Sequence, residues 1–475
     1  MAGNQMSLKL MVDKEMNRVV FAESGNDFVD VLFSFLTMPM GTIVRLTGKE
    51  SKMGGITTLY ESVKDLDVNL LQTNSCKKML LYPKSASEEH CNNLKVNIDN
   101  AKPTKYYVCS WNCCAHGSHL ISTVFDSKCE CGQSFKKQIV FDEKSNAGAS
   151  SKDGVFVKGN MRFIIRYDLQ VFPASVKAAS TMLKELGIHD VSVLEERNVN
   201  VGAAEVVHLL NCLILTKTPL TDVFLQNQHT IDRADLDSKL DALHLKDIAL
   251  DSKDLTQPRE GKGNGSDSKK ISVKLSVDKS NNKVVYAEGG EEFADLLFSF
   301  LAFPLGFVAK FFGGDSGIRC LDNLYRSVQV LGLEDLIKSE ECKDLLVDPN
   351  LACYFSSNNQ PLQIKEVAPW KPTIISCGEC NYIGDTVIKI ADYSFESCGH
   401  WESRKQLCTI NPKYPNVVRG LGGTFIAGPA LFMVTDELNV KQHSLWSVIP
   451  LLNELNICMG DLEEHVVSLA EEEVT

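Results

Sequence analysis

The sequence predicts an α+β protein of two tandem homologous domains, each with a β-hairpin plus helix opening and a zinc-ribbon-like cysteine knuckle. The first observation is a repeat: LKLMVDKEMNRVVFAESGNDFVDVLFSFLTMPMG, from Leu8 to Gly41, recurs as VKLSVDKSNNKVVYAEGGEEFADLLFSFLAFPLG, from Val273 to Gly306. The second is a change in apolar spacing within both copies, from strand-like to helical. The third is a set of short cysteine pairs that follow each copy at a corresponding place.

Each copy is expected to begin with a β-hairpin. Leu8 to Val12 and Arg18 to Glu23 are strand-like runs, the second rich in β-branched and aromatic residues. Turn-forming residues separate them at Asp13 to Asn17, and the second copy repeats this arrangement at Asp278 to Asn282. Two such runs joined by a short polar turn are typical of an antiparallel pair.

An amphipathic helix should follow each hairpin. Apolar side chains recur at i, i+3, i+4, i+7 and i+8, which lines one helical face and favours a hydrophobic core. These positions are Phe28, Val31, Leu32, Phe35 and Leu36, and Phe293, Leu296, Leu297, Phe300 and Leu301. Asn26 is a candidate cap, and Pro39 and Pro304 should end the helices because proline lacks the next backbone donor. A strand over Thr42 to Leu46 is expected next.

Matching segments continue beyond this opening. Tyr60 and Tyr325 lie in matched segments with helical character, and Cys76 and Cys342 are matched lone thiols expected to be buried. The first copy should close with strands at Met161 to Arg166 and Val191 to Glu195, and with helices at Ser175 to Leu186 and Ala203 to Leu215. The second copy has a strand-like Ala430 to Val434, a helical Ser444 to Leu455, and no room for the last helix after Leu469.

These matches predict three parts of the chain: a first repeat domain over residues 6–225, a flexible linker over 226–270 and a second repeat domain over 271–470. The linker is polar and charged and becomes glycine-rich at its end, although Asp232 to Leu250 could form a short helix.

The cysteine pairs predict structural zinc sites. Two short turns that each present two sulfur or imidazole ligands can build one tetrahedral site, and glycines such as Gly132 and Gly399 ease the tight turns. The predicted ligands are Cys109, Cys113, Cys129 and Cys131 in the first copy, and Cys377, Cys380, Cys398 and His400 in the second. Alternative ligands are Cys114, His116, His119 and Cys408. Reduced thiols in a core and redox chemistry remain alternatives to zinc.

Composition excludes some function classes. A net charge of −12 without a long basic run argues against a nucleic-acid partner. No stretch approaches a transmembrane length, and the first residues lack the apolar core of a secretory signal. The expected location is cytoplasmic, with nuclear access left open. In such a compartment the 16 cysteines indicate thiols or metal ligands rather than a disulfide framework.

Taken together, the repeated opening, the NLY segment, the Cys-Lys-x-x-Leu-Leu segment, the cysteine knuckles and the LKELGI segment resemble the plant-specific domain-of-unknown-function family 674. The resemblance covers nearly the whole chain outside the linker. It implies a plant source, a duplicated unit and a soluble intracellular protein. It transfers no catalytic residues, because none are established for that family.

The function favoured by the sequence is a non-enzymatic interaction or adaptor protein, in which two related surfaces engage a protein partner. The first alternative is an enzyme or small-molecule binder with a cleft between the halves. It requires the recurring acids Glu23, Glu288, Asp30 and Asp295 to face that cleft. The second alternative is thiol-redox or stress-linked chemistry, which requires exposed cysteines of low pKa. No catalytic or cofactor-binding residue is predicted.

Overall fold

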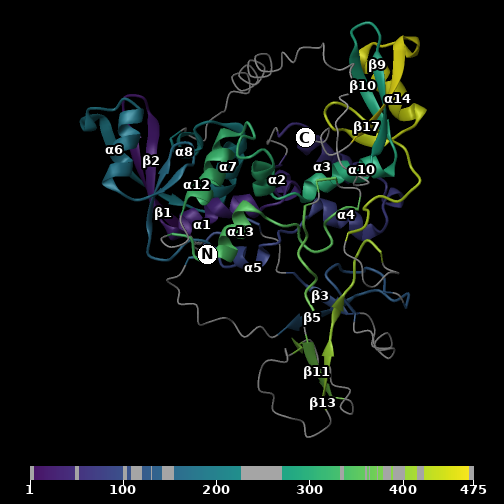
Figure 1. Cartoon of the computed structure of the whole chain (residues 1–475), viewed down its shortest axis with the longest axis horizontal. Helices are drawn as coiled ribbons and strands as arrows, with labels where there is room; N and C mark the ends of the chain where they lie inside the picture. The colour runs from purple at the N-terminus through teal and green to yellow at the C-terminus, as the bar shows by residue number, and fades with distance from the viewer. Residues whose placement is uncertain are drawn as a thin grey trace, which may run out of the picture.

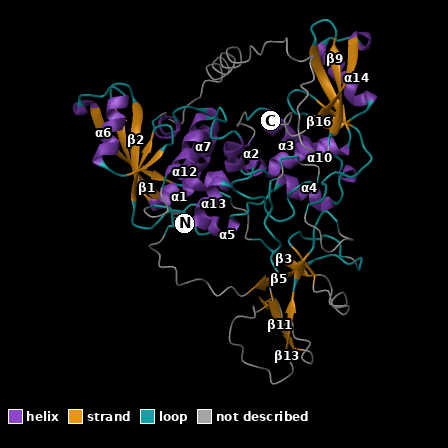
Figure 2. Cartoon of the chain, viewed as in Figure 1, coloured by secondary structure: helices purple, strands orange, loops and turns teal. Residues whose placement is uncertain are grey.

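The computed structural model describes residues 5–48, 53–99, 104–108, 120–129, 131–141, 154–225, 270–331, 336–358, 361–362, 364–371, 373–377, 387–388, 402–414 and 422–469. These residues form four β-sheets, and most helices lie between the two large five-stranded ones (Figure 2). In the described part of the chain, no helix is long and apolar enough to cross a membrane. Residues before and after the segment 226–269 are called the first half and the second half below.

The first large sheet is built on the predicted hairpin. Its order is β7-β6-β2-β1-β8, and all of its pairs are antiparallel. The strands are β1 (Met6–Asp13), β2 (Arg18–Gly25), β6 (Arg162–Arg166), β7 (Val171–Pro173) and β8 (Leu194–Val201). Alternate residues of β1 are buried, as the sequence pattern predicts.

The second large sheet repeats this order strand for strand as β16-β15-β10-β9-β17. Its strands are β9 (Ile271–Asp278), β10 (Lys283–Gly289), β15 (Phe432–Val434), β16 (Val440–Gln442) and β17 (Leu462–Leu469). Both hairpins place an asparagine at positive φ in the turn, Asn17 at 45° and Asn282 at 55°. Asparagine tolerates this conformation better than most residues, so the turn chemistry explains why both hairpins form.

The predicted amphipathic helices are confirmed as α1 (Asn26–Ser34) and α10 (Glu291–Ser299), each extended by a short 3-10 turn, η1 (Phe35–Thr37) or η6 (Phe300–Ala302). Their apolar stripes are buried in hydrophobic cores. The predicted cap is wrong, because Gly25 occupies the N-cap and Asn26 is already the first helical residue.

The strand predicted over Thr42 to Leu46 is also wrong, since this segment belongs to helix α2 (Met40–Thr47). Its β-branched residues favour a strand locally. However, Pro39 at the N-cap starts a helix, and the helical conformation buries Ile43 and Val44. Tertiary packing therefore outweighs local propensity. The matching segment forms α11 (Leu305–Phe311).

Of the other helices in the described part of the chain, five fall close to predicted places, whereas the four of eight residues or fewer were not predicted. These helices are α3 (Gly55–Asp65), α4 (Asn74–Leu81), α5 (Glu88–Cys91), α6 (Val176–Glu185), α7 (Ala203–Leu215), α8 (Pro219–Phe224), α12 (Arg319–Val330), α13 (Glu340–Val347) and α14 (Leu445–Leu455). Short 3-10 turns lie at η3 (Val68–Leu70), η5 (Val191–Val193) and η7 (Met459–Asp461). Part of the strand predicted at Val191 to Glu195 is thus η5, and the strand itself begins at Leu194.

The two halves exchange helices. Helices α12 and α13 of the second half lie beside α1 of the first half, whereas α3 and α4 of the first half lie beside α10 (Figure 1). The core around α1 contains buried side chains of the second half, including Leu321, Leu324, Val328, Ile337 and Leu346. The core around α10 contains buried side chains of the first half, including Leu59, Val63, Leu66, Met79 and Leu80. Each hydrophobic core is therefore shared between the halves.

Paired hydrogen bonds accompany this exchange. The backbone N–H of Val171 donates to the Ser327 hydroxyl at 2.9 Å, and that of Val440 donates to the Ser62 hydroxyl at 3.0 Å. Between the halves, Met40 N–H donates to the Phe303 carbonyl at 2.9 Å, and the reverse contact joins Leu305 to Met38 at 3.0 Å. Contacts that recur with the halves interchanged are the pattern of an approximate two-fold axis.

The regions that follow the shared helices form a smaller part of the fold, drawn at the bottom of Figure 1. One sheet has the order β12-β5-β3-β4-β14 and joins strands of both halves, while β11 and β13 form a separate pair. These strands are β3 (Tyr106–Val108), β4 (Leu120–Ser122), β5 (Lys137–Phe141), β11 (Thr373–Cys377), β12 (Val387–Ile388), β13 (Glu402–Gln406) and β14 (Cys408–Thr409). Strands of both halves that neighbour the predicted knuckles thus meet in one sheet, whereas Cys377 lies on β11 in the separate pair.

Candidate functional site

Most of the predicted zinc ligands lie outside the described residues. These are Cys109, Cys113, Cys380, Cys398 and His400, together with the alternatives Cys114, His116 and His119. Cys377 is the last residue of β11. Among the residues that the structure describes, no group of three or more His, Cys, Asp or Glu side chains is arranged to hold a metal ion. The zinc sites therefore remain a prediction.

The part of the first knuckle that is described forms a tight turn. The backbone N–H of Gly132 donates to the Cys129 carbonyl at 2.9 Å, and Gly132 has a φ of +80°, as expected for the glycine of such a turn. Cys129 is buried in a small core with Phe135, and Cys408 of the second half packs against that core. Cys131 is exposed and forms a disulfide, which differs from the expected thiol or thiolate.

Four thiols at buried or half-buried positions have the opposite electrostatics from a reactive cysteine. Burial raises the pKa of Cys91 to about 11, and it raises the pKa of Cys212, Cys320 and Cys353 to about 12. A reactive cysteine needs a lowered pKa, because the thiolate is the nucleophile. These four side chains are therefore packing residues.

Three acid pairs recur in the sequence, and the structure shows the contacts of each. Asp13 accepts hydrogen bonds from the turn N–H groups of Glu15 and Met16, and Asp278 accepts one from Ser280, so this pair shapes the hairpin turns.

Glu23 and Glu288 lie on the large sheets. Glu288 contacts Lys274 at 3.0 Å and His443 at 3.4 Å. Glu23 contacts Arg162 at 3.9 Å and lines a hollow of about 350 Å³ beside α6. Neither residue lines the cavity described below.

Asp30 and Asp295 are buried loop anchors. Asp30 accepts hydrogen bonds from the backbone N–H groups of Val155, Phe156 and Val157 at 2.8, 2.7 and 3.0 Å. Burial raises its pKa from 3.8 to about 6, against the opposing effect of these three donors. Asp295 accepts from the matching loop at Phe425 and Ile426 and from the Ser357 hydroxyl, and burial raises its pKa as well.

Lys413 lies next to this second anchor and is fully buried. Its ammonium donates to the carbonyls of Ser356 and Gly423 and sits 3.8 Å from the centre of the Phe425 ring. Burial lowers its pKa to about 8, and the negative charge of Asp295 opposes that shift. The pair holds two loops together deep in the fold, so we interpret it as structural.

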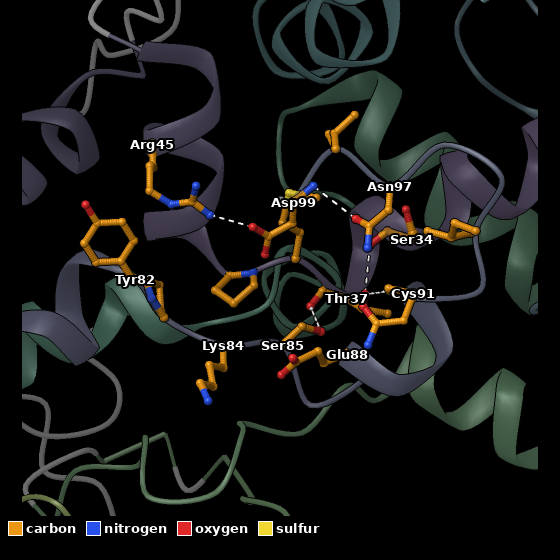
Figure 3. Close-up of a pocket in the computed structure, with 16 residues that line it drawn as sticks. Ser34, Thr37, Arg45, Tyr82, Lys84, Ser85, Glu88, Cys91, Asn97 and Asp99 are labelled. Atoms are coloured by element: carbon orange, nitrogen blue, oxygen red, sulfur yellow. Dashed lines mark hydrogen bonds and ion pairs between the residues drawn. The ribbon is translucent and has the colours of Figure 1, made fainter. Parts of the chain in front are cut away.

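A cavity of about 310 Å³ lies beside α2 and α5, and all of its lining residues belong to the first half. Figure 3 shows Arg45 and Tyr82 on one side of it and Thr37, Cys91 and Asn97 on the other. Its volume is at the lower end of the range typical of small-molecule sites. This cavity is not the cleft between the halves that the alternative function requires, because only residues of the first half line it.

Charged groups of the cavity form two small networks. Arg45 Nη2 donates to Asp99 Oδ1 at 2.7 Å. Lys84 Nζ donates to the Thr104 hydroxyl at 3.0 Å, and that hydroxyl donates to Glu88 Oε2 at 2.6 Å. Burial lowers the pKa of Lys84, and the charge of Glu88 opposes this shift.

Sequence reasoning did not find this cavity, although the repeat contains a signal for it. Thr37, Ser85 and Glu88 line the cavity, and their counterparts in the second copy are Ala302, Leu351 and Tyr354. A position that is polar in one copy and apolar in the other indicates that the polar side chain is not needed for packing the shared fold. Comparing the copies for such differences, rather than for identities, would have indicated the site.

Comparison with known proteins gives one match. No curated protein and no solved structure shows a significant match to the chain. A family match, by contrast, spans almost the entire sequence, in agreement with the resemblance found in its motifs. The chain belongs to the family described as Protein of unknown function (DUF674), which matches residues 2–472.

Proposed function

We propose that this protein is a non-enzymatic interaction protein that docks a protein partner on the outer face of α14. The observation that carries the proposal is the exposure of Trp446, which is 89% accessible, beside Leu445 at 66% and Ile449 at 43%. An exposed aromatic and aliphatic cluster on one helix is a common feature of protein-binding surfaces, where tryptophan is enriched among the residues that dominate affinity.

The matching helix of the first half supports this assignment. Helix α6 covers its own sheet in the same way that α14 covers the other sheet, through Met182 and Leu452 respectively. The counterparts of Trp446 and Ile449 on α6 are Lys177 and Ser180. Val176, the counterpart of Leu445, is exposed as well, so Trp446 and Ile449 are what distinguish the outer face of α14. Because α6 packs on its sheet without apolar residues at these two positions, packing within the fold does not explain them.

A site-specific photo-crosslinker tests this proposal. We expect a crosslinking amino acid at position 446 to yield a discrete adduct with one protein in extracts of the native tissue. The same amino acid at position 177 is the matched control, because Lys177 occupies the corresponding place on α6. Equal labelling at both positions, or none at 446, would contradict docking through α14.

We also propose that the cysteine knuckles hold structural zinc in the reduced protein. In the first half this requires the disulfide of Cys131 to be reduced, because a cysteine is a zinc ligand only as the thiolate. The recurrence of the cysteine pairs at corresponding places in both halves supports this proposal.

Elemental mass spectrometry of protein purified without added zinc measures this directly. The expected result is two zinc ions per chain, with one lost in Cys129→Ala and the other in Cys398→Ala. Absence of metal, together with a full titration of the thiols other than Cys131, would instead leave the cysteines as core or redox residues.

A further inference from the structure

The cavity beside α2 and α5 combines an apolar floor with a charged rim. Met38, Pro39 and Ile98 supply apolar surface, and Arg45 and Lys84 supply the two cationic groups. Small-molecule sites typically have this composition, in which apolar walls provide affinity and a few polar groups fix orientation. The cavity is therefore built like a binding site.

The carboxylates of the rim already have partners, whereas one cationic donor does not. Both oxygens of Glu88 accept hydrogen bonds from Thr104, at 2.8 and 2.6 Å, and Asp99 accepts one from Arg45. Arg45 Nε is buried and has no hydrogen-bond partner among the described residues. A buried donor on a charged group is costly to leave unpaired, so a movement of Arg45 that opens Nε to the cavity would favour an acceptor there, and a negatively charged one fits best.

Tyr82 supports a ligand at this end of the cavity. Its ring centre lies 5.5 Å from the Arg45 guanidinium carbon, and the side chain is 62% exposed. The ring thus stands at the rim next to the unpaired donor, where it can cover the apolar body of a bound molecule.

The second copy of the repeat shows that the fold does not need this cavity. At the positions of Ser85 and Glu88 it has Leu351 and Tyr354, which are 1% and 5% exposed and belong to its hydrophobic core. Ser85 and Leu351 also form a β-bridge with each other across the two halves, so they occupy equivalent places. One copy fills the space with apolar side chains, while the other keeps it open and polar.

We propose that this cavity binds a small organic acid, whose acidic group pairs with Arg45 and whose apolar body lies against Met38, Pro39 and Ile98. This site is separate from the α14 surface and does not depend on it.

Isothermal titration calorimetry with three naphthalene derivatives tests the proposal on the full chain. The probes are naphthoate, naphthamide and naphthylmethylammonium, which share an apolar body and carry a negative, neutral or positive group. We expect naphthoate to bind at least about tenfold more tightly than the amide, because one charge-assisted hydrogen bond to Arg45 is sufficient for a tenfold difference in affinity. The cationic probe should bind most weakly.

Four variants locate the binding. Ser85→Leu copies the second half and should abolish binding by filling the cavity. Arg45→Met should remove the preference for naphthoate over naphthamide, and Arg45→Lys should keep part of it because the charge remains without the Nε donor. Trp446→Ser should leave binding unchanged, which separates this site from α14.

Thermal unfolding of each variant shows whether it is still folded. Arg45→Met tests the site independently of Ser85→Leu, because it does not fill the cavity. Naphthoate binding that survives both Ser85→Leu and Arg45→Met would overturn the proposal. So would an amide that binds as tightly as the acid, or the absence of binding by any probe at millimolar concentration.

Discussion

Replacing Asp30 with alanine should lower the free energy of unfolding by about 3 kcal/mol at neutral pH. Three backbone N–H groups lose the carboxylate that accepts from them in this variant, those of Phe156 and Val157 at buried positions and that of Val155 at a half-buried one. Each unsatisfied donor costs about 1–3 kcal/mol. Relief from burying the charge offsets part of that loss, because burial raises the pKa of Asp30 from 3.8 to about 6 even against these three donors.

The loss should also depend on pH, with a sign fixed by the direction of the pKa shift. A raised pKa means that the folded protein binds a proton that the unfolded chain does not, so Asp30 stabilises most below pH 3.8 and this contribution is lost as the pH rises through about 6. The difference between wild type and Asp30→Ala should therefore be about 2 kcal/mol larger at pH 4.5 than at pH 7.5. Urea denaturation at both values measures it.

Asp27→Ala is the matched control, because this residue lies on the same helix but pairs with Lys95 on the surface, where both side chains are nearly half exposed. It should change stability by less than about 0.5 kcal/mol. Asp295→Ala should follow Asp30→Ala in direction, since it anchors the matching loop. A pH-independent difference for Asp30→Ala would show that its carboxylate is not destabilised by burial.

Local pattern was sufficient to predict the hairpins and the helices that follow them. The alternation of β1, the turn residues around Asn17 and the stripe from Phe28 to Leu36 are properties of short stretches, and the structure confirms each element they predict. The failure at α2 has the same origin. Thr42 to Leu46 is locally strand-like, and only its burial against other helices makes it helical.

The site could not be predicted in the same way. The partners of Asp30 lie more than a hundred residues away in sequence, and those of Lys413 are backbone carbonyls that have no sequence signature. Nor does periodicity reveal which half a helix packs on, because the apolar face of α12 suits either core. The exchange of helices is visible only in three dimensions.

Separating the halves should prevent either from folding alone. Expressed as residues 1–225 and 270–475, each fragment would lack helices that complete its core. The first fragment alone lacks Leu321, Leu324 and Val328, all fully buried in its core, at about 1.5–3 kcal/mol for each side chain. With the other exchanged residues, this sum reaches the entire stability of a typical domain, about 5–15 kcal/mol.

Co-expressed, the same fragments should instead assemble into a stable one-to-one complex, since the exchanged helices are held by packing and hydrogen bonds rather than by chain connectivity. Size-exclusion chromatography with light scattering distinguishes the outcomes. Leu324→Asp is the decisive variant, because it places a charge in the shared core and should abolish the complex, whereas Lys177→Ala on the exposed face of α6 should not. Two fragments that each fold cooperatively as monomers would mean that the halves are independent domains, and that the contacts between them are docking rather than exchange.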